Sequence, residues 1–241
     1  MTQIKHAIIF GGSRGIGAAI VARLAREGHR VSFTFISSEE KAAALADKIE
    51  RRGGSAFPIN ADSSDVAQIR RAVEQAVERH GPIDILVVNA GLFRMATIDA
   101  VTVDDLDQML AVNVRGVFLA IQAGAAQLRD GGRVVTIGSN VAIRTGMAGA
   151  SVYQFTKAAV AAMVKGLALD LAPRGITVNN IQPGPTDTDI NAGALDALAG
   201  MSPLKRVASP DEIAALVAYI TGAEAGYMTG SSVTIDGGFT L

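Results

Sequence analysis

Tyr153 and Lys157 are the two residues of this sequence whose chemistry depends most directly on their spacing. They lie four positions apart within residues 151–171, a stretch that predicts a helix, so both side chains project from one face about one turn apart. A free phenol has a pKa of about 10 and exchanges protons poorly at neutral pH. We expect the Lys157 ammonium to lower the pKa of Tyr153 and make it an acid or base. The same pair occurs in helices without chemistry, so the rest of the chain must decide.

A glycine-rich turn follows the first predicted strand. Apolar residues 7–10 run into this turn at residues 11–17, and residues 18–27 then repeat apolar positions at helical spacing. Glycines let the backbone approach a pyrophosphate, and the amides at a helix amino end stabilise its charge. A tight turn without a ligand would need the same glycines, but the position between strand and helix favours a dinucleotide site. Its candidate residues are Gly11, Ser13, Arg14, Gly15, Ile16 and Gly17.

The second strand is predicted for residues 30–36, and the position near its end that often holds an acidic residue holds Phe35. A carboxylate there would bind the ribose 2′-hydroxyl of NAD and repel the 2′-phosphate of NADP. Ser37 and the guanidinium of Arg14 can instead bind a phosphate. These features favour NADP(H) over NAD(H). The alternative is that Arg14 is a solvated loop residue and that Glu39 or Glu40 supplies the acidic group.

Further polar or small residues lie where later strands are expected to end. Asp62 follows a strand at residues 56–60 and could bind the adenine amino group or cap the helix expected at residues 66–80. In an open α/β sheet, ligands bind at the carboxyl edge. The other candidates at this edge are Asn89, Ala90 and Gly91 after residues 83–88, Ser139 at the end of residues 133–139, and Pro183, Gly184, Thr186 and Thr188 after residues 176–182.

One long helix is predicted for residues 103–128, with Asn113 in its interior. Asparagine is unfavourable there, so it could kink the helix, hold a water or simply be exposed. Residues 190–204 are small and apolar with interspersed glycines, which suits either a mobile lid or a surface loop. A further helix at residues 210–220 and a strand at residues 231–235 are expected to follow.

The composition limits the partners. The 241 residues are 49% hydrophobic, which predicts a single domain over residues 1–241. With 22 basic and 23 acidic residues, the net charge of -1 offers no field that attracts a nucleic-acid polymer or an anionic membrane. The absence of cysteine and of a signal-peptide pattern favours the cytoplasm. We expect no membrane span, because no uninterrupted apolar stretch is long enough, and no metal site, because the three histidines are scattered.

Strands alternating with helices predict an α/β fold with a parallel, doubly wound sheet. The glycine turn, the Asn89-Ala90-Gly91 stretch, Asn113, Ser139 and the Tyr153/Lys157 pair occur in an order that resembles the short-chain dehydrogenase/reductase family over essentially the whole chain. The resemblance implies a seven-stranded Rossmann fold. It also implies that the glycine turn lies under the cofactor pyrophosphate, with residues 89–91 beside the adenosine half.

The same resemblance implies catalytic roles. Tyr153 would be the general acid in reduction, and Lys157 would lower its pKa while holding the nicotinamide ribose. Ser139 would orient the carbonyl, and Asn113 would hold a water in a proton relay. The segment that would bind the carboxamide comprises Pro183, Gly184, Thr186 and Thr188. Two departures, Phe10 for the usual threonine and Val88 for the usual first asparagine, each remove a supporting hydrogen bond.

Two functions are therefore expected. The first is an NADPH-dependent reductase of a small-molecule carbonyl, similar to β-ketoacyl-carrier-protein reductases. The second follows because the glycine turn and residues 84–91 also resemble a bacterial member described as binding a cyclic dinucleotide and mediating biofilm dispersal. In such a regulator Arg94 and Arg144 could bind phosphates. Family resemblance further implies a homotetramer or homodimer.

Overall fold

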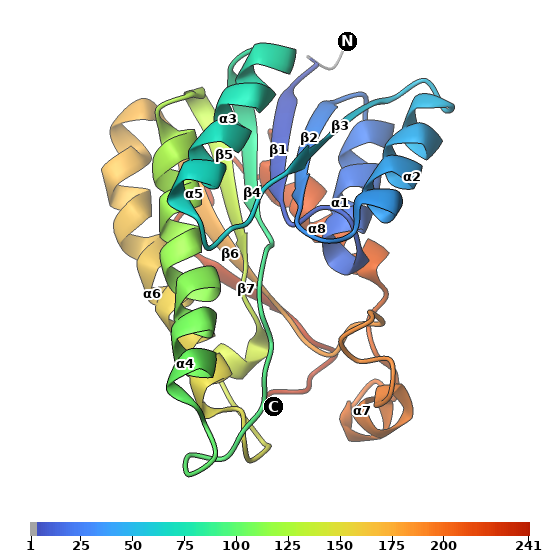
Figure 1. The fold of residues 1–241 in the computed structure, drawn as a ribbon, viewed down its shortest axis with the longest axis vertical. Coiled ribbons are helices and arrows are strands. Elements are labelled where there is room, and N and C mark those ends of the chain that lie inside the picture. Colours follow the sequence, from blue (N-terminus) through green and yellow to red (C-terminus); the bar gives the residue numbers. More distant parts are fainter. Residues whose placement is uncertain (1–3) are drawn as a thin grey trace.

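The computed structural model describes residues 4–241, which share one seven-stranded sheet flanked by helices on both faces (Figure 1). The strand order is β3-β2-β1-β4-β5-β6-β7, and every pairing is parallel. The predicted doubly wound α/β fold is confirmed. The strands are β1 (His6–Phe10), β2 (Arg30–Phe35), β3 (Ser55–Asn60), β4 (Ile83–Val88), β5 (Leu128–Ile137), β6 (Thr177–Pro183) and β7 (Ser232–Ile235).

The helices bury a separate apolar cluster on each face of the sheet. One cluster lies under α1, α2 and α8, and the other lies under α3, α5 and α6. Because both faces are covered, the central strands are almost continuously apolar. The helices are α1 (Gly15–Arg26), α2 (Glu39–Glu50), α3 (Val66–His80), α4 (Val103–Leu110), α5 (Val117–Ala125), α6 (Ser151–Leu171), α7 (Leu195–Met201) and α8 (Pro210–Thr221).

The strand order reverses at β1: β2 and β3 lie on one side of it, and β4 to β7 lie on the other. β1 pairs with β2 on one side and with β4 on the other, so the connections leaving this point diverge and open a crevice at the carboxyl ends of the strands. The glycine turn follows β1 and Asn89 follows β4, which brings both to this crevice. Among residues 4–241, no helix combines the length and apolar character needed to cross a membrane.

The prediction of one helix over residues 103–128 is wrong. α4 and α5 are separated by a π-helical segment, Ala111–Gly116, and α5 ends at Ala125. A π-helical turn accommodates an extra residue and often occurs at a functional position. The following strand begins at Leu128, earlier than expected, because its pairing with β4 shifts register around the Gly131 bend, where φ is +76°.

Two other local predictions need correction. Residues 190–204 are not wholly irregular, since they contain α7. The N-cap of α3 is Asp65, whose side chain accepts from the backbone amides of Ala67 and Gln68, so the capping role considered for Asp62 is wrong. Asp62 instead accepts from the Ser64 amide at 2.7 Å.

The histidines are less scattered than their sequence positions suggest. His6 and His80 lie edge to face, with ring centroids 5.3 Å apart, at the amino edge of the sheet far along the strands from the crevice. Within the described part of the chain, no three His, Cys, Asp or Glu side chains are grouped so that they could hold a metal ion.

Candidate active site

A cavity of about 840 Å³ opens at the carboxyl edge of the sheet, between the glycine turn and the amino-terminal half of α6. It is large enough for a dinucleotide together with a small substrate. Most sequence-predicted site residues line it: Gly11, Ser13, Arg14, Gly15, Ile16, Ser37, Asp62, Asn89, Ala90, Gly91, Ser139, Tyr153, Lys157, Pro183, Gly184, Thr186 and Thr188. Gly17 and Asn113 do not.

Asn89 and Thr34 fix the glycine turn. The Asn89 side-chain amide donates to the Gly11 carbonyl at 2.6 Å, and the Thr34 hydroxyl accepts from the Gly11 amide at 2.9 Å. Thr34 lies next to the last residue of β2, whereas Phe10, which stands where the family usually has threonine, is buried in the core. No sequence pattern predicts this contact, because Thr34 lies within a mostly apolar strand.

Gly17 does not line the cavity; it packs against Gly11 and Asn89 on the other side of the glycine turn. A Cβ atom on Gly17 would lie 2.0 Å from the Gly11 carbonyl oxygen and 2.7 Å from the Asn89 side-chain nitrogen. Only glycine therefore lets α1 begin directly against the turn. The first amides of α1 consequently face the cavity floor, where an anion is favoured by the helix dipole.

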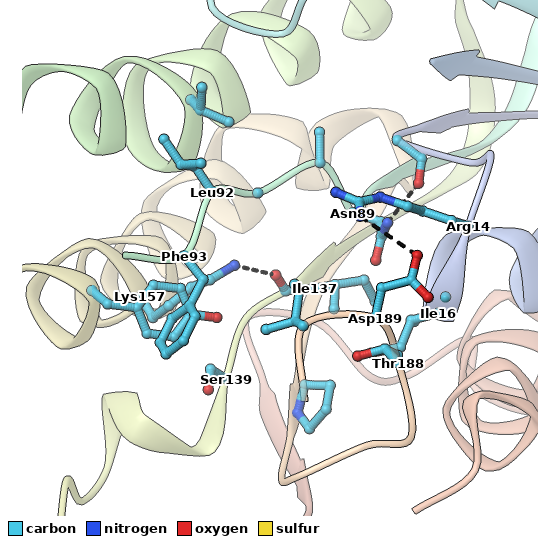
Figure 2. A pocket seen from close by; sticks show the side chains of 18 of the residues that line it. Arg14, Ile16, Asn89, Leu92, Phe93, Ile137, Ser139, Lys157, Thr188 and Asp189 are labelled. Atoms are coloured by element: carbon cyan, nitrogen blue, oxygen red, sulfur yellow. Dashed lines mark hydrogen bonds and ion pairs between the residues drawn. The ribbon is translucent and has the colours of Figure 1, made fainter. Parts of the chain in front are cut away.

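Tyr153, Lys157 and Ser139 come together in the other half of the cavity. Lys157 is 4% exposed and donates from Nζ to the Ile137 carbonyl at 3.0 Å (Figure 2). That ammonium lies 5.7 Å from the centre of the Tyr153 ring. Ser139 lies two residues after β5, where its hydroxyl contacts the phenol. The helical spacing of Tyr153 and Lys157 and the position of Ser139 just after β5 therefore bring these three side chains together.

Comparison with known proteins identifies the family to which the chain belongs. A family described as enoyl-(acyl carrier protein) reductase matches residues 11–240. A short-chain dehydrogenase/reductase from Serratia marcescens is 50% identical, with a TM-score of 0.97 and 99% of each chain covered. The chain belongs to the short-chain dehydrogenase/reductase family.

Other members of the family differ in what their names say they bind. A short-chain dehydrogenase from Burkholderia cenocepacia, solved in complex with NADP, is 47% identical with a TM-score of 0.95, covering 98% of each chain. The cyclic-di-GMP-binding biofilm dispersal mediator protein of Escherichia coli is 41% identical over 98% of this chain and 97% of its own. A 3-oxoacyl-(acyl-carrier-protein) reductase of Staphylococcus aureus is 33% identical over 100% of both.

In this short-chain dehydrogenase/reductase, the pKa of Tyr153 departs from expectation. Burial raises it to about 12, and contact with Ser139 only moderates the rise, so the protein alone does not lower it as the sequence suggested. Burial also lowers the pKa of Lys157 to about 8. With a pKa near 12, the phenol is protonated throughout the physiological range.

Asn113 is fully buried, so the exposed alternative is wrong. Its oxygen accepts from the Leu92 amide at 2.7 Å, while its nitrogen donates to the Leu92 carbonyl at 2.8 Å and to the Thr156 hydroxyl at 3.2 Å. These bonds join the π-helical segment to α6 and to the loop after β4. In this structure Asn113 positions that loop.

Apolar side chains line the cavity around Tyr153, Lys157 and Ser139. The Phe93 ring packs edge to face on Tyr153 with ring centroids 4.8 Å apart. Phe239 reaches the cavity because Asp236 accepts from the Gly238 and Thr240 amides, at 2.9 and 3.0 Å, and so bends the last residues over its mouth. The sequence did not single out these side chains. The apolar lining of this half comprises Leu92, Phe93, Val141, Met147, Ile190, Leu198 and Phe239.

The two arginines considered for binding a cyclic dinucleotide already interact with other residues of the chain. Arg94 lines the cavity but pairs with Asp105 and donates to Gln108 at 2.7 Å. Arg144 does not line the cavity, and it donates to the Leu241 carbonyl at 2.5 Å. Glu39 and Glu40, the acidic alternatives for NAD, lie in the first turn of α2 and are not part of the cavity wall.

Proposed function

We propose that the protein is an NADP(H)-dependent reductase that converts a carbonyl to an alcohol. The observation that supports this is the single cavity that joins the Tyr153, Lys157 and Ser139 group to the glycine turn. The turn needs glycine at position 11, because a Cβ there, where φ is +79°, would lie 2.8 Å from the Ala90 backbone. The amides at the start of α1 would bind the pyrophosphate. The cofactor, when bound, supplies the hydride.

The residues around the carbonyl would divide the proton chemistry. Tyr153 donates its hydroxyl proton to the carbonyl oxygen as negative charge develops there, and Ser139 donates a hydrogen bond to the same oxygen. The Lys157 ammonium stabilises the resulting phenolate and binds the ribose hydroxyls. Asn113 would support this group indirectly, because its bonds to Leu92 and Thr156 hold the loop after β4 against α6.

The apolar lining around Phe93 supports an uncharged carbonyl compound as substrate, because the guanidinium of the neighbouring Arg94, which also lines the cavity, is paired with Asp105. The direct test is NADPH oxidation measured against ketones, aldehydes and β-ketoacyl thioesters. Oxidation with at least one class at a rate well above the substrate-free rate would support the proposal. No oxidation with any of the three classes would reject it.

Arg14 should determine the preference for NADP(H). Its side chain is mostly exposed and lines the cavity near Ser37, where no carboxylate follows β2. The change Arg14→Glu replaces a phosphate-binding cation with an anion, so NADPH affinity should fall about tenfold or more while NADH affinity changes little. Fluorescence titration with both cofactors measures the ratio. An unchanged ratio would contradict the assignment.

A second candidate function is suggested by the 41% identical biofilm dispersal mediator. A regulator of this kind would bind a cyclic dinucleotide without turnover. Calorimetry with cyclic-di-GMP tests it: binding at micromolar ligand would support the regulator, and no heat at millimolar ligand would reject it. The arginines that could bind its phosphates, Arg94 and Arg144, already have partners, so we favour the reductase.

The outer faces of α5 and α6 support a homodimer or homotetramer. Phe118 is 42% exposed, Phe155 is 52% exposed and Leu169 is 77% exposed. Exposed apolar side chains gathered on adjacent helices are typical of protein interfaces. We also propose a cytoplasmic location, supported by the lack of cysteine.

A further inference from the structure

Asp189 links two cations at the mouth of the cavity. Its Oδ2 atom lies 3.7 Å from Nη1 of Arg14 and 3.2 Å from Nζ of Lys41. Arg14 comes from the glycine turn, Lys41 from α2 and Asp189 from the segment that follows β6. Figure 2 shows Arg14 extending over the cavity toward Asp189. Three segments distant in the sequence thus meet in one ion-pair cluster.

The cluster includes Arg14, which we have proposed as the residue that binds the 2′-phosphate. Ser37 and Arg14 line the same cavity, and Lys41 lies in the first turn of α2, which begins two residues after Ser37. The segment that bears Asp189 is held close to the glycine turn, because a Cβ on Gly15 would lie 3.2 Å from the Thr188 methyl group. An anion bound to Arg14 at this position would therefore lie close to the Asp189 carboxylate.

We propose that Asp189 is a cofactor-specificity residue that competes with the 2′-phosphate of NADP(H) for Arg14 and Lys41. The inference rests on the proposed NADP(H) site and adds two residues to it. A phosphate monoester carries nearly two negative charges at neutral pH, so it must displace the carboxylate or accept its repulsion. The 2′-hydroxyl of NAD(H) is uncharged, so it need not displace the carboxylate and is not repelled by it. Asp189 therefore reduces the preference for NADP(H) over NAD(H) that Arg14 and Lys41 would otherwise give.

The charge state of Asp189 agrees with this role. The Lys41 ammonium, followed by Arg14, holds the pKa of the Asp189 carboxyl below its ordinary value. The carboxylate is therefore ionised throughout the neutral range and remains a competitor at any pH where the enzyme would work. Because the ion pairs are exposed, each is weak, and a phosphate can displace the carboxylate.

The test compares adenosine 2′,5′-bisphosphate with 5′-AMP, two probes that differ only in the 2′-phosphate, by calorimetry on the full chain. Asp189→Asn should tighten the bisphosphate about three- to tenfold and leave 5′-AMP within about twofold. The gain should shrink at about 0.5 M salt, where exposed charges are screened. Lys41→Gln should weaken the bisphosphate alone.

Asp187→Asn is the matched control, because it removes the same charge from an exposed position in the same segment. Asp187→Asn should change neither affinity. The inference is overturned if Asp189→Asn weakens the bisphosphate, leaves it unchanged, or alters both probes equally, or if Asp187→Asn has the same effect. A parent protein that binds both probes equally would instead contradict the NADP(H) site itself, and absent carbonyl reduction would contradict only the proposed reaction.

Discussion

The change Tyr153→Phe should lower NADPH-dependent carbonyl reduction about a hundredfold or more, because removal of a general acid typically costs that much. The substitution deletes one hydroxyl group and keeps the ring, so the edge-to-face packing on Phe93 at 4.8 Å is retained. Cofactor affinity should remain within about twofold. Initial rates of NADPH oxidation, together with fluorescence titration of NADPH, separate the two effects.

Tyr227→Phe is the matched control for this substitution, because Tyr227 is fully exposed. The Tyr227→Phe variant should reduce carbonyl substrates at the parent rate. Equal rates in Tyr153→Phe and the parent protein would remove the phenol from the mechanism.

The pH profile offers a check on the same group. Tyr153 keeps its proton until about pH 12, whereas burial lowers the pKa of Lys157 to about 8. As the pH rises through about 8, Lys157 loses the charge that stabilises a phenolate, so kcat/KM for NADPH should fall above that pH. This ratio reports groups in the free enzyme. A profile that is flat to pH 10 would contradict the role of Lys157.

Gly17→Ala should abolish NADPH binding and lower the melting temperature. The added methyl group would lie 2.0 Å from the Gly11 carbonyl oxygen, and this contact involves backbone that cannot rotate away. Either α1 moves away from the glycine turn or the turn deforms, and both remove the anion-binding amides. Thermal unfolding and NADPH titration measure the two losses. Parent-like binding would show that the turn does not need this glycine.

Two further variants show whether the effect is specific. Gly166→Ala places the same methyl group on α6, where nothing lies within 4 Å, so it should stabilise the protein by about 1 kcal/mol through helix propensity. Asn89→Ala removes the 2.6 Å bond to Gly11 without adding a clash, so it should weaken NADPH binding less than Gly17→Ala does.

The sequence was sufficient for the features that depend on local periodicity. Strand, turn and helix around Gly11 follow from apolar runs interrupted by glycine, and the Tyr153/Lys157 pair follows from helical spacing. The carboxyl ends of parallel strands necessarily share an edge, which is why Ser139 could be assigned to the cavity in advance.

The remaining features depend on contacts between residues distant in the chain. Asn113 interrupts its helix because its amide bonds to Leu92, and no local pattern announces that partner. The pKa of Tyr153 depends on how deeply the phenol is buried, which spacing cannot give. By sequence Asp62 could cap the helix at residues 66–80, and only the path of the backbone shows that Asp65 caps it instead.

The bend made by Asp236 has a practical consequence for handling the protein. Phe239 borders the substrate half of the cavity, and Leu241 is held by Arg144. A purification tag fused after Leu241 would emerge beside the entrance and obstruct ligands or displace Phe239. β1 begins with His6 at the opposite edge of the sheet, so a tag attached ahead of the first strand would leave that entrance clear.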